Sequence, residues 1–236
     1  SPERMASKRL VDMNAAAGIA VETGDSEATT EFVNHVIGDQ RRQQLLARAC
    51  PISKAQLARI AASVDHVYLG PLHPLDIEPQ ALSGLEGVAR VSLDIQGYTR
   101  KVEGSEVRPG VSPHLDLALA QAGIVTASRD ETEAVVEFYG KELRAVMAEH
   151  GIDQWLTTDG RSGGWLLGRS GKRHDFRAEP VDEIVDPTGA GDVFFAAYLT
   201  YHLYEGANVD AALDRAARLT ALQVRGQFIP PGELSR

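Results

Sequence analysis

Cysteine is nearly absent from the sequence: Cys50 is the only one among 236 residues. A single thiol cannot close a disulfide within the chain and cannot supply a cysteine-based zinc site. The 7 histidines also lack the spacing that metal ligands show. A disulfide-stabilised fold and a structural zinc centre are therefore excluded, and a reducing cytoplasm is the compartment that we expect.

Long apolar runs and excess positive charge are also lacking. The longest apolar run, residues 193–203, is too short to span a bilayer and is interrupted by Thr200 and His202. The net charge is −9, whereas nucleic acid or an anionic membrane usually selects a basic face. We expect neither as a partner. A nucleotide remains compatible, because a few backbone amides and one metal ion can hold phosphates locally.

The composition that is present is typical of one globular domain. Hydrophobic residues make up 43% of the chain and charged residues 24%, and no repeat, low-complexity segment or linker divides it. Residues 1–236 are therefore predicted to form a single α/β domain with a well-buried core.

From residue 53 onward, helix-like and strand-like segments alternate, which predicts a mainly parallel sheet with helices on both faces. The expected pairs of helix and strand are 54–63 with 66–69, 78–85 with 90–95, 114–121 with 124–127, and 131–150 with 154–158. A late hairpin at 165–167 and 174–178 and two closing helices at about 190–204 and 208–224 complete the prediction. In such sheets, ligands bind at the carboxyl ends of the strands.

The front of the chain follows a different pattern. We expect an amphipathic helix at 3–17, a short strand at 19–22, and strands at 29–37 and 42–49 joined by a turn at Gly38-Asp39. These strands, within about 19–49, predict a small antiparallel sheet.

Two glycines flank Ala190 immediately before the apolar, helix-like run that starts at Val193. Glycine lets the backbone approach a ligand closely, and a helix N-terminus presents unpaired N–H groups and a positive dipole end. Gly189, Ala190 and Gly191 therefore predict an anion hole for a transferring phosphoryl group. Asp192, at its mouth, is placed to act as general base toward an attacking hydroxyl. The structural alternative is that Asp192 only caps the helix while the glycines turn the chain.

The whole string Asp186-Pro-Thr-Gly-Ala-Gly-Asp192 resembles the C-terminal signature of the ribokinase-like carbohydrate kinases, the phosphofructokinase B type. The resemblance implies a ribokinase-like α/β fold in which a small antiparallel lid accompanies the mainly parallel sheet. It also implies an ATP-dependent kinase that uses Mg²⁺, with Asp186 near the nucleotide.

Two further segments are similar to motifs of this family. Thr158-Asp-Gly-Arg-Ser-Gly163 matches its Thr-x-Gly-x-x-Gly nucleotide loop, which implies that Thr158, Gly160 and Gly163 contact ATP; an ordinary glycine turn is the alternative. Ser128-Arg-Asp-Glu131 resembles its Asn-x-x-Glu motif, in which the Glu acts on Mg²⁺ through water. Ser128 stands where the family has Asn, and a capping box formed by Ser128 and Glu131 is the alternative.

The acceptor side carries weaker signals. Asp94-Ile-Gln-Gly-Tyr-Thr-Arg100 is similar to a segment of inositol kinases, so Gln96 and Arg100 are candidate substrate residues, with a structural turn as the alternative. Residues 29–34, together with Arg41 and Arg42, resemble the lid strands of the family. The family often uses these strands as a dimer contact, so a homodimer through the lid is one expectation.

The opening elements of the family are not found in the sequence. A strand with a substrate-binding Asp and a Gly-Gly-x-x-x-Asn segment normally come first, whereas residue 1 falls in the predicted helix before the lid strands. We therefore expect a domain that lacks the first strands of its sheet and much of its acceptor surface.

The function predicted from the sequence is transfer of a phosphoryl group from ATP to a hydroxyl of a sugar or polyol. A nucleoside kinase and a non-catalytic nucleotide-binding protein of the same fold stay open as alternatives. The segment at Gln96 favours a polyol over a nucleoside, and the intact Asp192 argues against a protein that only binds.

Overall fold

The computed structural model describes residues 11–16, 18–37 and 40–227. The strands of its main sheet are β3 (His66–Leu69), β4 (Arg90–Asp94), β7 (Ile124–Ser128), β8 (Gln154–Thr158), β9 (Gly164–Gly168) and β10 (Arg173–Phe176). They form a 6-stranded sheet in the order β10-β9-β8-β7-β4-β3. Pairing is parallel from β3 through β8, and β9 and β10 add an antiparallel hairpin at one edge. The predicted mainly parallel sheet is confirmed.

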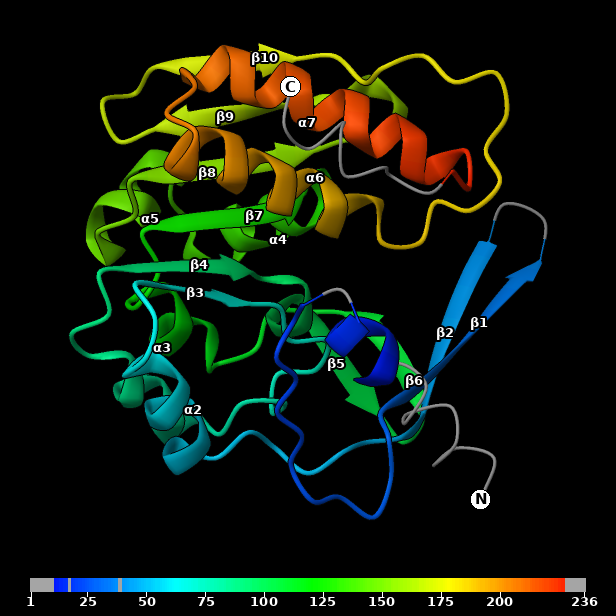
Figure 1. Cartoon of the computed structure of the whole chain (residues 1–236), viewed down its shortest axis with the longest axis vertical. Helices are drawn as coiled ribbons and strands as arrows, with labels where there is room; N and C mark the ends of the chain where they lie inside the picture. The colour runs from blue at the N-terminus through cyan, green and yellow to red at the C-terminus, as the bar shows by residue number, and fades with distance from the viewer. Residues whose placement is uncertain (1–10, 17, 38–39, 228–236) are drawn as a thin grey trace.

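Helices cover both faces of this sheet (Figure 1). One face is covered by α2 (Lys54–Ala61), α3 (Leu115–Leu119), α4 (Arg129–Tyr139) and α5 (Leu143–His150), the other by α6 (Ala190–Leu199) and α7 (Val209–Val224). Successive strand residues alternate between the two cores: Val125 and Trp155 belong to the first, Ile124 and Leu156 to the second. Because both faces are buried, the central strands are almost continuously apolar.

A second, 4-stranded antiparallel sheet stands beside the main one. Its strands are β1 (Glu31–Ile37), β2 (Gln40–Ala47), β5 (Arg100–Glu103) and β6 (Glu106–Pro109), in the order β1-β2-β6-β5. Figure 1 shows β1 and β2 projecting on the side toward which the parallel strands point. The two lid strands were expected, whereas the β5–β6 hairpin, which turns through Gly104 at a φ of 64°, was not.

Other parts of the front section differ from expectation. The strand predicted at 19–22 is wrong: these residues are exposed and belong to no strand. Residues 11–16 of the predicted first helix are helical. Its other residues before 11, residue 17 and the turn at Gly38-Asp39 lie outside the described residues. A dimer contact through the lid stays a prediction.

The helix predicted at 131–150 is in fact two helices. α4 ends at Gly140, whose φ of 60° is left-handed, and α5 begins at Leu143. Only glycine adopts this conformation without strain, so it ends the helix there. The helix predicted at 78–85 is a 3₁₀ helix, Pro79–Leu85, and α6 continues into a π-helical turn at Thr200–Tyr204.

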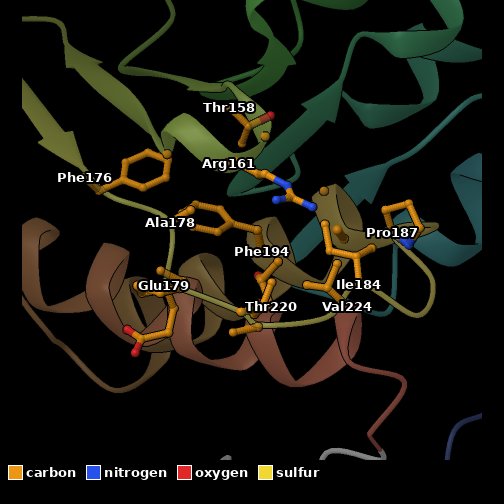
Figure 2. Close-up of a pocket in the computed structure, with 18 residues that line it drawn as sticks. Thr158, Arg161, Phe176, Ala178, Glu179, Ile184, Pro187, Phe194, Thr220 and Val224 are labelled. Atoms are coloured by element: carbon orange, nitrogen blue, oxygen red, sulfur yellow. The ribbon is translucent and has the colours of Figure 1, made fainter. Parts of the chain in front are cut away.

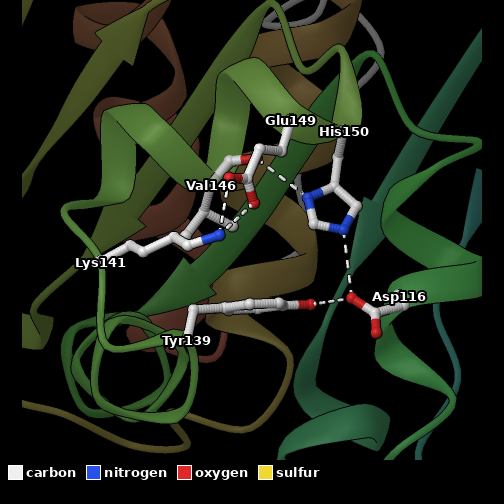
Figure 3. A network of polar contacts seen from close by, with 6 residues as sticks. All are labelled: Asp116, Tyr139, Lys141, Val146, Glu149 and His150. Carbon is white, nitrogen blue, oxygen red and sulfur yellow. Dashed lines mark hydrogen bonds and ion pairs between the residues drawn. The ribbon is translucent and has the colours of Figure 1, made fainter.

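A polar network joins α3, α4 and α5 after the break at Gly140 (Figure 3). The Tyr139 hydroxyl donates to the carboxylate of Asp116, and this hydrogen bond is the main cause that lowers the pKa of Asp116. His150 Nε2 lies 3.2 Å from the same carboxylate. Lys141 Nζ and Glu149 Oε1, 2.6 Å apart, form an ion pair beside it. These contacts hold α5 at its angle to α4.

A buried polar chain ties α4 to β8. The indole Nε1 of Trp155 donates to Thr132 Oγ1 at 3.2 Å, and Thr132 Oγ1 lies 3.0 Å from Thr157 Oγ1. All three side chains are buried. Because buried polar groups are costly when they lose a partner, this chain fixes the relative position of the helix and the strand.

We predict that Trp155→Phe lowers the free energy of unfolding by about 1–2 kcal/mol, since it removes the indole donor and leaves a small void. Urea titration followed by circular dichroism measures the change. The matched control is Trp165→Phe, because Trp165 is only partly buried, with Arg173 over its ring. An equal loss in the two variants would contradict the role of the buried chain.

Candidate active site

The parallel register ends three strands at one edge of the sheet. Asp94, Ser128 and Thr158 are the last residues of β4, β7 and β8. Ser128 pairs with Thr158, and Asp94 pairs with Thr126 two residues before the end of β7. The carboxyl ends of parallel strands are where α/β proteins bind ligands. The structure therefore brings two predicted nucleotide residues and the start of the inositol-kinase-like segment to the same edge.

The N-terminus of α6 faces this edge. Gly189 is its N-cap residue and has a left-handed φ of 77°, and Val193 N–H donates the first helical hydrogen bond to the Gly189 carbonyl at 2.9 Å. Within the described residues, the N–H groups of Gly191 and Asp192 have no hydrogen-bond partner. A Cβ at Gly191 would meet open space. Two unpaired donors at the positive end of a helix favour the binding of an anion, so this helix start is a candidate anion site.

The segment before α6 is held by its own hydrogen bonds. Asp186 Oδ1 accepts from Thr188 N–H at 2.8 Å, which lowers the pKa of Asp186. The N–H groups of Val185 and Asp186 both donate to the carbonyl of Val224 at the end of α7. The carboxylate of Asp186 thus stabilises the turn that leads into the anion site, and it is not among the residues that line the neighbouring cavity.

A cavity of about 430 Å³ lies between this helix start and the loop after β8 (Figure 2). Thr158, Gly160 and Gly163 of the predicted nucleotide loop line it, and so do Ala190 and Gly191. Most of its wall is apolar, formed by Phe176, Ala178, Val181, Ile184, Phe194, Ala217, Ala221 and Val224. The stacked rings of Phe176 and Phe194 are 4.7 Å apart. Such a wall suits a flat aromatic ligand, with polar groups at one end.

The loop after β8 is constrained by close backbone approach. Gly163 has a φ of 89°, and a Cβ there would lie 2.7 Å from Arg177 Cα. Asp159 N–H donates to the Gly163 carbonyl at 2.7 Å, and the Asp159 carboxylate pairs with Arg129 at 2.7 Å. Glycine is therefore required at position 163 by both conformation and space.

Ser128 and Glu131 form a reciprocal capping box at the start of α4. Glu131 Oε2 accepts from Ser128 N–H at 2.7 Å, and Ser128 Oγ accepts from Glu131 N–H at 3.3 Å. The alternative reading of this motif is thus present in the structure. One oxygen of Glu131 is engaged in the cap, so a water-mediated contact to Mg²⁺ would have to use the other.

Asp192 lies between the cavity and two residues that the sequence analysis did not single out. The Tyr68 hydroxyl of β3 donates to Asp192 Oδ1 at 3.4 Å, a long hydrogen bond. Burial is the largest cause that raises the pKa of Tyr68, and Asp94 and Asp192 add to it. Burial likewise raises the pKa of Asp94 to about 7, with further contributions from Glu131 and Asp192. Glu131 and Asp192 are therefore close enough to Asp94 to interact with it electrostatically.

Gln96 and Arg100 do not line the cavity. Gln96 N–H donates to Asp94 Oδ1 at 2.7 Å within the turn after β4. Arg100 donates to the carbonyl of Leu72 at 3.3 Å, and its guanidinium lies 5.6 Å from the ring centroid of Phe32 in the lid. Arg100 thus connects the segment at Leu72 with lid strand β1, and Gln96 belongs to the turn after β4.

The comparisons with known proteins agree with this geometry. Residues 6–227 match the profile of the pfkB family carbohydrate kinases. The chain belongs to this family. No curated protein matches the sequence.

Solved structures of ribokinase-like kinases share the fold of this family member. A pyrophosphate-dependent kinase in the ribokinase family, solved as a sulfate complex, superimposes with a TM-score of 0.81 at 21% identity, over 96% of this chain and 81% of its own. Ribokinase from Thermotoga maritima gives 0.73 at 19% identity, over 98% and 76%. Adenosine kinase from Schistosoma mansoni gives 0.71 at 18% identity, over 98% and 73%. The ribokinase-like fold class is confirmed.

The described residues contain neither a ready-made metal-binding group nor a membrane-spanning helix. No group of three or more His, Cys, Asp or Glu side chains there is arranged to hold a metal ion. Among the same residues, no helix combines the length and apolar character needed to cross a membrane.

We predict that Asp94→Asn removes a pH dependence from the stability of this kinase. The pKa of Asp94 is raised in the folded protein, so the folded state holds the proton more tightly than the unfolded state. The unfolding free energy therefore falls as the pH rises from about 4 to about 7. Asn retains the oxygen that accepts from Gln96 and does not titrate, so the variant gains about 2 kcal/mol relative to wild type between pH 5 and pH 8.

Urea denaturation of both proteins at the two pH values measures this difference. The same stability difference between variant and wild type at pH 5 and pH 8 would rule out a raised pKa at Asp94.

Proposed function

We propose that this kinase transfers the terminal phosphoryl group of ATP to a hydroxyl of a sugar or polyol, with Asp192 as general base. The observation that carries the proposal is the position of Asp192. It follows Gly191 of the anion site on one side and contacts Tyr68, beside Asp94, on the other. A carboxylate between a phosphate site and a hydroxyl site is where proton abstraction is needed.

The donor would occupy the cavity between α6 and the loop after β8. Its apolar wall fits an adenine ring, which inorganic pyrophosphate lacks, and this favours ATP as the donor. The phosphates would reach the unpaired N–H groups of Gly191 and Asp192. These N–H donors would stabilise the negative charge that develops on the phosphoryl oxygens during transfer.

The acceptor would bind between the end of β4 and the lid. Asp94, Gln96 and Arg100 offer hydrogen-bonding groups that suit the hydroxyls of a sugar or polyol. The acceptor hydroxyl would give its proton to Asp192 as its oxygen attacks the terminal phosphorus in line with the leaving group.

Mg²⁺ bound to the phosphates would neutralise charge and align the two reacting groups. Glu131 and Asp192 are close enough to Asp94 to add to the pKa shift that burial causes, and the charge of these carboxylates would attract a cation that arrives with the phosphates. Glu131 would contact the metal through water, because part of its carboxylate caps α4.

A screen of sugars, inositols and nucleosides with ATP or pyrophosphate as donor tests the reaction. ATP-dependent turnover of a sugar or polyol is the expected result. Preference for a nucleoside would mean that the acceptor is a nucleoside and not a sugar or polyol. Preference for pyrophosphate would mean that pyrophosphate and not ATP is the donor. Nucleotide binding without turnover of any acceptor would point to a protein that only binds.

We predict that Asp192→Asn lowers kcat by roughly 10²–10⁴, because it removes the base and keeps the size of the side chain. The dissociation constant of a non-hydrolysable ATP analogue should change little, which separates loss of chemistry from loss of the donor site. Turnover within a factor of about three of wild type would sink the base assignment.

A further inference from the structure

Arg161 is a charged residue in a cavity whose wall is mostly apolar. It sits on the one-turn helix Gly160–Ser162 after β8 and lines the cavity together with Ala190 and Gly191. Figure 2 shows its side chain reaching from this loop toward Ile184 and Pro187, across the start of α6. The guanidinium therefore lies on the side of the cavity where Ile184 and Pro187 also line it.

Within the described part of the chain, Arg161 has no hydrogen-bond or ion-pair partner. Other exposed arginines nearby are paired: Arg129 with Asp159 at 2.7 Å and Arg169 with Asp153 at 2.8 Å. Glu179 is the carboxylate among the described residues that line the cavity, and Figure 2 shows it turned away from Arg161. An unpaired guanidinium in a protein of net charge −9 indicates an anionic ligand.

The base of the Arg161 side chain is held in place. The Asp159–Gly163 backbone hydrogen bond closes the loop, and Ser162 N–H donates to the Asp159 carbonyl at 2.9 Å. The close approach of Gly163 to residues 176–178 anchors the loop to the opposite wall. A cation on such a braced loop loses less freedom on binding than one on a mobile segment.

Arg161 and the start of α6 both line the cavity. The unpaired N–H groups of Gly191 and Asp192 lie at the start of α6, and Arg161 reaches across from the loop. A guanidinium can bind two phosphate oxygens at once through its parallel donors. Two linked phosphates would offer oxygens to the guanidinium and to the N–H groups of α6 together.

We propose that Arg161 binds the terminal diphosphate of the phosphoryl donor and so selects for a phosphoanhydride chain. The proposal rests on the proposed function, because it takes the cavity as the donor site. The shared chemistry is a P–O–P unit, which ATP and inorganic pyrophosphate both contain. Arg161 would bind that unit, whereas the apolar wall would contact the base of a nucleotide.

Calorimetric titration of the intact chain with three Mg²⁺-supplemented probes tests this: AMP-PNP, imidodiphosphate and adenosine. Arg161→Ala should weaken binding of AMP-PNP about 10- to 100-fold, the value typical of a charge-assisted hydrogen-bonded pair. Arg161→Lys should weaken it less, since an ammonium retains the charge without the paired donors. Adenosine, which has no phosphate, should bind Arg161→Ala and wild type within about twofold.

Arg169→Ala is the matched control. It removes the same charge from an exposed arginine paired with Asp153, outside the residues that line the cavity. Its affinity for AMP-PNP should equal that of wild type. A comparable loss in both variants would reduce the effect of Arg161 to net charge and overturn the proposal.

The remaining outcomes separate this inference from the kinase function. AMP-PNP affinity unchanged in Arg161→Ala, or no binding of either phosphate probe by wild type, overturns the role of Arg161. If imidodiphosphate binds in a way that depends on Arg161 and AMP-PNP does not bind, the role of Arg161 is supported and pyrophosphate takes the place of ATP as the donor. Arg161-dependent AMP-PNP binding by a wild type that phosphorylates no acceptor supports Arg161 and overturns the proposed transfer.

Discussion

The parallel pairing of β4, β7 and β8 is the constraint on which the rest of the site depends. Its register sets Asp94, Ser128 and Thr158 at one edge, where Ser128 caps α4 and the other two lead into the 3₁₀ turns Gln96–Thr99 and Gly160–Ser162. A shift of one residue in this register would exchange the two cores and turn every strand side chain to the opposite face. Because both cores are apolar and closely filled, the sheet has one register that buries them, and the site inherits its precision from that packing.

The donor side of the site depends on glycines that are required for two different reasons. Gly189 has a left-handed φ, and a Cβ there would meet only Asp192 Oδ2, at 3.9 Å, so its role is to turn the chain into α6 and leave the N–H groups free. Gly163 combines a left-handed φ with close contact to the segment after β10, so its role is to bring two loops together. The same residue type thus opens the anion site and closes the cavity beside it.

Local signals allowed much of this to be predicted from the sequence. Alternation gave the parallel sheet, and Gly189–Asp192 was placed correctly at a helix start. The break at Gly140 and the hairpin β5–β6 were missed, since a single glycine or a short polar strand carries little periodic signal. Tyr68 and Asp94 were not singled out, because the Tyr68–Asp192 hydrogen bond and the electrostatic effect of Asp192 on Asp94 join residues far apart in the chain.

The two sides of Asp192 differ in the charge of the groups that surround them. On the donor side stand unpaired N–H groups, the positive end of α6 and Arg161, all of which favour an anion. On the other side stands Asp94; burial is the main cause that raises its pKa to about 7, and the charges of Glu131 and Asp192 raise it further. In the proposed reaction, a phosphate chain would be attracted to the donor side, whereas a neutral polyol would meet no electrostatic penalty beside Asp94. Charge would then direct the two substrates to opposite sides of Asp192, where the proposed proton transfer takes place.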